Sequence, residues 1–213
     1  MIISIPTIKD GYDKDYIISS KLSVFDSEWN ITKSLLHNTR TCLDIGAHIG
    51  IYALEYSKYF ENVHSFEPIP KIYEYLKTNT HYNSNINIYN TAISDKDDEY
   101  LQMLPHNRCT EINVVISEET DSYTKKRQWN DDNLIEVKSS TIDSYEFIDV
   151  DFIKIDTERY VFPVLKGMDK TLKNNNAILQ IEIDTQKDDI IDLLKKYGYS
   201  ACFSANREVW FTK

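Results

Sequence analysis

The sequence predicts an α/β fold: a doubly wound, mainly parallel sheet with helices on both faces, closed by an antiparallel C-terminal hairpin. Strand and helix patterns alternate from residue 41 onward, which is typical of such a sheet. Residues 152–156 form a nearly continuous apolar run of the kind found in central parallel strands. With 213 residues, 41% of them hydrophobic, the chain suits one core, so we expect residues 1–213 to form a single domain.

Residues 1–40 are expected to form a lead-in to this sheet. Phe25, Trp29 and Leu35 recur at helical spacing, which predicts a helix over residues 25–36. We expect this helix to cover the edge of the sheet or to close over the functional site.

The next elements alternate regularly. The predicted strands are 41–45, 63–66 and 87–90, and the predicted helices are 51–59 and 71–79. After the central strand, the pattern predicts a strand at 178–184 and a helix at 189–197, which Gly198 is placed to cap. Residues 199–203 and 209–212 predict the closing hairpin.

Residues 95–140 break this rhythm and are interpreted as an insertion. Short strands are predicted at 101–104 and 112–116, and a polar, charged segment follows them. Tyr123 and Trp129 are the large aromatic side chains of that segment. They either pin it to the surface or form a platform for a flat-faced ligand, since loops on a rigid scaffold often carry the substrate-specific part of a site.

The turn after the first strand reads Asp44-Ile-Gly-Ala-His-Ile-Gly50. Gly46 and Gly50 lack a Cβ, so the backbone can approach a ligand closely. His48 stands where the G-x-G-x-x-G dinucleotide fingerprint has its second glycine, which leaves less room for a pyrophosphate. The turn therefore favours a nucleoside without phosphates over NAD, although an ordinary strand-to-helix turn can have the same pattern.

A second acid, Glu67, follows the next predicted strand, and Pro68 ends that strand. Nucleotide-binding folds place a carboxylate at about this distance from the glycine turn to accept hydrogen bonds from the ribose hydroxyls. A solvated acid at a strand end is the alternative. The glycine turn in the same unit favours the ribose interpretation.

Several segments together resemble the FkbM-type methyltransferases, which are class I S-adenosylmethionine-dependent enzymes. The resemblance rests on ordered segments within residues 41–184: 43–50, 66–68, Leu76 with Asn79, 91–94, 141–144, 151–158, 164–167 and 181–183. It implies a seven-stranded Rossmann-like methyltransferase sheet with S-adenosylmethionine as cofactor. It also implies O-methylation of a sugar or glycan hydroxyl, or of a small metabolite. Because loops often carry the substrate-specific part of a site, we expect the 95–140 insertion to lie on the acceptor side.

The resemblance carries a set of cofactor-binding positions onto this chain. These are Asp44, Gly46, Ala47, His48, Gly50, Glu67, Pro68 and Ala92. Methyl transfer to oxygen needs little covalent machinery, because the protein mainly aligns the acceptor and removes its proton.

The candidates for that chemistry lie at the ends of two strands. Lys154 and Asp156 alternate onto one side of the central strand, as does Glu158 if extended geometry persists. Glu182 lies near the end of the next predicted strand, 178–184, toward the same edge as Asp184. We assign Lys154, Asp156, Glu158 and Glu182 as catalytic candidates, with an acid as base; the alternative is an ion pair without chemistry. Clustered acids would also suit magnesium, but such acids are common at strand ends, so no metal ligand is assigned.

The chain departs from the family pattern acid-x-Glu-Gly-x-Glu, because Arg159 replaces the glycine and Phe162 the last acid. Arg159 would form an ion pair or recognise an acidic or hydroxyl-rich acceptor. These departures keep open a second hypothesis, a catalytically impaired module that binds S-adenosylmethionine.

The formal net charge of −10 disfavours a nucleic-acid substrate, because polyanion binders usually present a basic face. An RNA ribose 2′-O-methyltransferase remains the second enzymatic hypothesis. It would need a basic surface, and the longest basic cluster in the sequence is residues 125–127. The 3 cysteines, Cys42, Cys109 and Cys202, are widely spaced, which disfavours a disulfide framework or zinc site.

The sequence contains no long apolar run and its first residues lack the features of a signal peptide. We therefore expect no membrane span and a cytoplasmic location, or the host cytoplasm if the source is viral. By analogy with glycan methylation, enzymes of polysaccharide assembly are expected partners.

Overall fold

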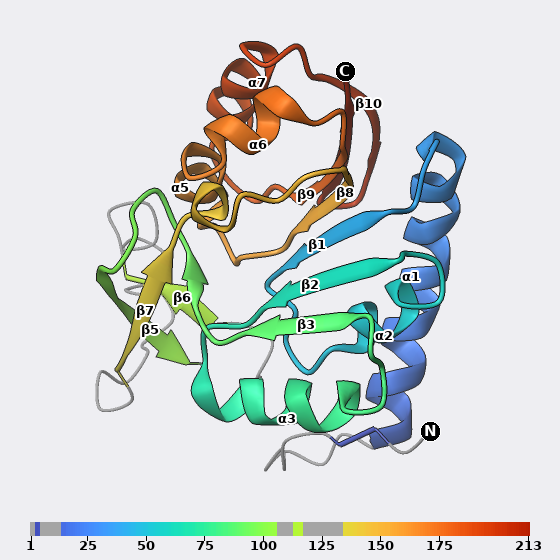
Figure 1. The fold of residues 1–213 in the computed structure, drawn as a ribbon, viewed down its shortest axis with the longest axis vertical. Helices are drawn as coiled ribbons and strands as arrows, with labels where there is room; N and C mark the ends of the chain where they lie inside the picture. Colours follow the sequence, from blue (N-terminus) through green and yellow to red (C-terminus); the bar gives the residue numbers. More distant parts are fainter. Residues whose placement is uncertain (1–2, 5–13, 106–112, 117–133) are drawn as a thin grey trace.

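The central sheet has seven strands in the order β10-β11-β9-β8-β1-β2-β3 (Figure 1). The computed structural model describes residues 3–4, 14–105, 113–116 and 134–213. The strands of this sheet are β1 (Thr41–Ile45), β2 (Asn62–Phe66), β3 (Ile86–Tyr89), β8 (Val150–Ile155), β9 (Ile178–Glu182), β10 (Ser200–Ala205) and β11 (Glu208–Thr212).

Most neighbours in this sheet are parallel. β1 pairs with β2 on one side and β8 on the other, and β3 and β9 extend the parallel part outward. β11 is antiparallel to both β9 and β10, so the chain ends in a hairpin. The predicted fold class is confirmed. Because the strand order reverses between β1 and β8, their connections diverge there, which is where open α/β sheets bind ligands.

Helices cover both faces of the sheet. The helices of the described chain are α1 (Lys14–Leu35), α2 (Ile51–Tyr56), α3 (Pro70–Thr80), α5 (Val161–Lys166), α6 (Asp169–Asn174) and α7 (Lys187–Lys195), with a 3₁₀ turn η2 (Ile142–Tyr145). Figure 1 shows α1 beside α2, and the two helices are in contact.

The side chains of the two faces alternate along each strand, as the β period requires. Phe25 and Trp29 of α1 pack in one cluster with Phe152 and Trp210 of the sheet. The opposite face has a second cluster, in which Leu43, Ile153 and Leu179 pack with residues of α5, α6 and α7 such as Val164, Leu172 and Leu194. The α1 side is the side that carries Lys154, because Phe152 and Lys154 are two residues apart.

A second, smaller sheet is built from three strands of the segment interpreted as an insertion and from β4, which precedes that segment. Its order is β4-β7-β5-β6, with β4 (Ala92–Ile93), β5 (Tyr100–Pro105), β6 (Asn113–Val115) and β7 (Ile135–Ser140). β5 and β6 confirm the short strands predicted at 101–104 and 112–116. Tyr123, Trp129 and Cys109 lie outside the described residues.

Several bounds differ from those predicted. α1 begins well before residue 25, α2 ends at Tyr56 rather than 59, and the short helices α5 and α6 had no counterpart in the prediction. Over the described ranges, every helix falls short of the length and apolar character that a bilayer crossing requires.

Candidate active site

The candidate site begins with a row of polar residues across the sheet. Asp44 of β1 is in register with Lys154 of β8, which is in register with Gln180 of β9. Two residues further along, on the same face, lie Asp156 and Glu182. Glu208 of β11 pairs with Glu182, so acids from the ends of two parallel strands meet one from the hairpin.

A cavity of about 440 Å³ opens at this edge of the sheet. Its apolar wall includes Ile45, Phe66, Pro68, Ala92, Ile93, Met103 and Val115. Its polar wall includes Glu28, His48, Glu67, Lys154, Asp156, Glu158, Glu182, Asn206, Arg207 and Glu208. The volume lies in the range of small-molecule and cofactor sites, and the two walls suit a ligand with one apolar and one polar end.

The glycine turn is shaped by packing within the protein. Gly46 has φ +92°, and a Cβ there would lie 1.8 Å from the carbonyl oxygen of Asp156. At Gly50, with φ +85°, a Cβ would lie 2.6 Å from Leu76 Cδ1. Gly46 is therefore required by the close approach of the Asp156 backbone, a reason that the sequence pattern does not reveal, whereas at Gly50 a leucine methyl group can move and the positive φ is the stronger requirement.

Glu67 joins the turn to the end of β2. Its Oε2 accepts a hydrogen bond from the backbone N–H of His48 at 3.0 Å, and its Oε1 accepts one from Ile69 at 2.9 Å. Burial raises the pKa of Glu67 to about 7, although these two bonds oppose the rise. Each carboxylate oxygen has a further lone pair, so Glu67 can still accept a hydrogen bond from a ligand hydroxyl.

The structure brings most of the predicted cofactor positions together. Gly46, His48, Glu67, Pro68 and Ala92 line the cavity. Asp44 and Ala47 line a smaller adjoining hollow of about 60 Å³. Gly50 lines neither among the described residues; it is the N-terminal cap of α2.

Lys154 is 2% exposed and lies between two carboxylates. Its Nζ donates to Asp156 Oδ2 at 3.3 Å and to Glu208 Oε1 at 3.2 Å. It also lies 5.3 Å from the centroid of the Tyr52 ring. Burial alone would lower the pKa of Lys154, but Asp156, Glu208 and Glu28 hold it well above its usual value. The shared orientation predicted for Lys154 and Asp156 is confirmed.

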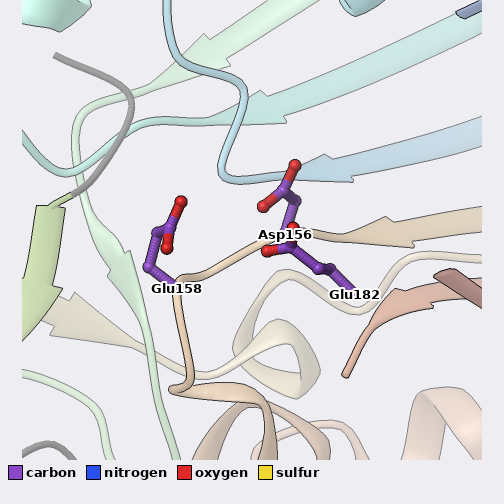
Figure 2. Close-up of side chains that lie close together, drawn as sticks. All are labelled: Asp156, Glu158 and Glu182. Atoms are coloured by element: carbon purple, nitrogen blue, oxygen red, sulfur yellow. The ribbon is translucent and has the colours of Figure 1, made fainter. Parts of the chain in front are cut away.

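Three acids gather where β8 and β9 end (Figure 2). Carboxylate oxygens of Asp156, Glu158 and Glu182 lie within 4.8 Å of one another. Burial, and then the charge of Asp156, raises the pKa of Glu158 to about 7 and that of Glu182 to about 9. Arg207 opposes this at Glu182, since its Nη2 lies 2.6 Å from Glu182 Oε1. With Lys154 and Arg207 supplying counter-charge, we assign no metal to these acids.

The backbone turns sharply after Asp156. Glu158 has φ 47° and Arg159 has φ 80°, so both residues lie in the left-handed region rather than in an extended conformation. Extended geometry therefore ends before Glu158, and a turn rather than strand alternation brings its carboxylate to the cluster. Arg159 has the left-handed conformation that glycine adopts without strain, at the position where the family pattern has glycine.

The departures from the family pattern lie beside the cavity. Arg159 Nε lies 3.7 Å from Asp184 Oδ2, and both side chains are largely buried. Phe162 belongs to α5, where Lys166 Nζ lies 4.6 Å from its ring centroid. Neither Arg159 nor Phe162 is among the described residues that line the cavity. Of the two roles considered for Arg159, the structure contains the ion pair.

Sequence reasoning missed two groups of lining residues. Glu28 and Tyr52 come from α1 and α2, and Tyr52 donates a hydrogen bond to Glu28 at 3.2 Å. Residues 206–208 come from the turn of the C-terminal hairpin and the first residue of β11. The charged pair Arg207-Glu208 before an apolar strand was the available signal, but its partners are distant in sequence.

Comparisons with known proteins identify the family and the fold of the chain. The family model described as Methyltransferase FkbM domain matches residues 44–201. No curated protein sequence matches the chain significantly.

Solved structures resemble the chain at low sequence identity. A methyltransferase FkbM from Methylobacillus flagellatus KT has a TM-score of 0.54 and 18% identity, over 84% of this chain and 45% of that one. The chain therefore spans less than half the length of that protein. The magnesium protoporphyrin IX methyltransferase from Synechocystis PCC 6803 with bound SAM has a TM-score of 0.50 and 10% identity, over 96% of this chain and 86% of that one. Likeness at these identities concerns the fold alone.

Proposed function

The chain belongs to the FkbM methyltransferase family, and from this premise we propose that it methylates a hydroxyl of a sugar, a glycan or a small metabolite with S-adenosylmethionine. The observation that carries the proposal is the cavity at the carboxyl edge of the sheet. The lining on the β2 side includes Phe66 and Glu67, and the lining on the β8 and β9 side includes Lys154 among acids. The acceptor class is inferred from the family resemblance and from the acidic character of the chain.

The apolar lining residues and Glu67 suit the nucleoside part of the cofactor. Ala92 and Pro68 supply apolar contact for a flat base, and Glu67 can accept hydrogen bonds from ribose hydroxyls. The backbone N–H of His48 fixes the orientation of that carboxylate. Asp44 borders the adjoining hollow, where it could bind an ammonium group.

S-adenosylmethionine, when bound, supplies an already activated methyl group. The chain must then orient the acceptor hydroxyl in line with that methyl and take its proton as the new C–O bond forms. Asp156 is the base that fits best: Lys154 donates to it, which favours its ionised form. Glu182, with a pKa of about 9, is protonated at neutral pH and serves as a donor rather than a base.

Cofactor binding tests the first part of the proposal without an acceptor. Calorimetric titration with S-adenosylhomocysteine should show binding to the wild type and a loss of at least about tenfold in affinity for Glu67→Ala and Asp44→Ala. Glu136→Ala, at an exposed position of β7, is the control and should bind as the wild type does. No binding by the wild type would refute the proposed cofactor.

Methyl transfer tests the second part. The protein with methyl-labelled S-adenosylmethionine should label a hydroxyl-bearing acceptor in a panel of glycans, sugars and small alcohols. Asp156→Asn should reduce that labelling by about 100-fold or more, the scale expected for loss of a positioned base. Labelling of RNA in preference to every glycan would replace the proposed acceptor class.

A further inference from the structure

The turn of the C-terminal hairpin belongs to the site in space although it is distant in sequence. Residues 206–208 line the cavity. The backbone N–H of Ile183 donates to the carbonyl of Arg207 at 2.8 Å, which fixes the turn to the end of β9. The side chain of Arg207 then pairs with Glu182 and with Asp184. The hairpin therefore contacts Glu182, one of the three clustered acids, directly through Arg207.

Glu208, the first residue of β11, makes the second connection between the hairpin and the site. It is 8% exposed, and its Oε1 accepts a hydrogen bond from Lys154 Nζ at 3.2 Å. Its Oε2 has no hydrogen-bond partner among the described residues. A buried carboxylate is costly unless it is paired, so the ammonium of Lys154 is the contact that compensates for burying Glu208.

Lys154 has three donor hydrogens and a flexible side chain, so its direction depends on its acceptors. Glu208 and Asp156 lie at nearly equal distances, 3.2 and 3.3 Å, from Nζ. The face of Tyr52 borders the ammonium at 5.3 Å. Glu208 thus supplies a fixed anchor, and the remaining hydrogens can be directed at Asp156.

We propose that Glu208 is a positioning residue, which holds the Lys154 ammonium against Asp156 so that Asp156 stays ionised and oriented toward the acceptor hydroxyl. This inference rests on the proposed function for its catalytic meaning. The structural part of the proposal is that Glu208 controls the contact between Lys154 and Asp156. This part does not depend on which acceptor is methylated.

The test uses carboxyl-carbon NMR to follow the titration of Asp156 in the full chain, in the wild type and in Glu208→Gln. If Glu208 were only a nearby negative charge, removing it would lower the pKa of Asp156. If it holds Lys154 in place, removing it weakens the contact that favours ionised Asp156, and the pKa of Asp156 rises instead. A fall or no change overturns the proposal. Asp156→Asn assigns the signal, and Glu136→Gln is the matched control at an exposed strand position.

Glu208→Gln leaves the buried Lys154 ammonium with one fewer counter-ion, which can destabilise the fold. A second pair of variants therefore tests the proposal without the single variant Glu208→Gln. If Glu208 acts through Lys154, the double variant Lys154→Met/Glu208→Gln should melt no lower than Lys154→Met alone. Additive losses would show that Glu208 has a role separate from Lys154 and would overturn the proposal.

Cofactor titration separates failure of this inference from failure of the proposed function. S-adenosylhomocysteine should bind Glu208→Gln within about threefold of the wild type, because Glu208 lies on the side of the cavity that includes Lys154. With an acceptor, kcat should fall by about 100-fold while the KM for the cofactor stays unchanged. If the wild type does not bind the cofactor, the methyltransferase proposal is refuted. The NMR titration still tests whether Glu208 controls the contact between Lys154 and Asp156.

Discussion

At the scale of single residues, Gly46 and Gly198 both have positive φ, but glycine is needed at the two positions for different reasons. Gly46 has φ +92° and a Cβ position filled by the Asp156 carbonyl, whereas Gly198 has φ +85° and open space around its Cβ position. Alanine at Gly198 therefore costs backbone strain alone, about 1–2 kcal/mol. Alanine at Gly46 adds a clash between the ends of β1 and β8, which must move apart.

We expect Gly46→Ala to lower the free energy of unfolding by at least about 4 kcal/mol, well beyond ordinary substitutions. Gly198→Ala is the matched control, because it has the same chemistry and nearly the same φ. Urea denaturation of both variants measures the difference. Equal losses would mean that the β1 and β8 ends can separate freely, contrary to the packing at the glycine turn.

The raised pKa values at the acid cluster predict how stability depends on pH. The carboxyls of Glu158 and Glu182 titrate near 4.5 in the unfolded chain but at about 7 and about 9 in the folded protein. Between these values the folded state holds protons that the unfolded chain has released. The free energy of unfolding should therefore fall as pH rises from about 5 to about 9.

Glu182→Gln should flatten this fall between about pH 7 and about pH 9, because glutamine does not ionise. The melting temperature at several pH values measures the slope, which is more informative than its absolute level because the contact with Arg207 also changes. Glu136→Gln should keep the wild-type slope. If Glu182→Gln keeps it as well, Glu182 does not titrate in that window.

At the scale of elements, α1 is attached to the sheet by buried hydrogen bonds as well as by apolar packing. Thr32 Oγ1 accepts from Trp210 Nε1 at 2.9 Å and donates to Gln180 Oε1 at 3.2 Å. Gln180 Nε2 in turn donates to Glu28 Oε2 at 2.8 Å. These bonds place Glu28 at the cavity, so the position of α1 and the composition of the site are linked.

Thr32→Val should destabilise the protein by about 1–3 kcal/mol, because it leaves the buried Trp210 N–H without its acceptor. Thr78→Val in α3 is a control of the same shape, since Thr78 is exposed and its hydroxyl donates to the carbonyl of Glu74 in its own helix. Its effect should stay within about 0.5 kcal/mol. Urea denaturation of the pair tests the attachment, and equal effects would contradict it.

The elements that the sequence predicted well are those with strong local signals. Apolar runs gave β1, β2, β8 and β9 to within a few residues, and the glycine positions marked the turns. α5 and α6 were not predicted because each is short and because Gly167, which lies between them, suggests a helix break in the sequence. Gly167 is in fact required by packing, since a Cβ there would lie 1.9 Å from the Ser94 carbonyl oxygen.

At the scale of the whole molecule, the site could be predicted only where it follows one strand and its loop. Lys154 and Asp156 are two residues apart, so strand alternation places them together. Glu208 and Glu28 reach the same cluster from opposite parts of the chain. Their approach depends on the register of β11 against β9 and on the docking of α1, which no local pattern contains.

Whole-molecule charge gives the last prediction. The net charge is −10, and the polar wall of the cavity is mostly acidic, while Lys154 and Arg207 are already paired with carboxylates. RNA binding releases counterions only where free cations meet phosphates, so its affinity falls steeply with salt. We therefore expect filter binding of single-stranded RNA to be weak at about 50 mM salt and to lack the steep loss by about 200 mM that phosphate contacts produce. Tight, salt-sensitive binding would place a basic surface on this chain and favour a ribose hydroxyl of RNA as acceptor over a glycan hydroxyl.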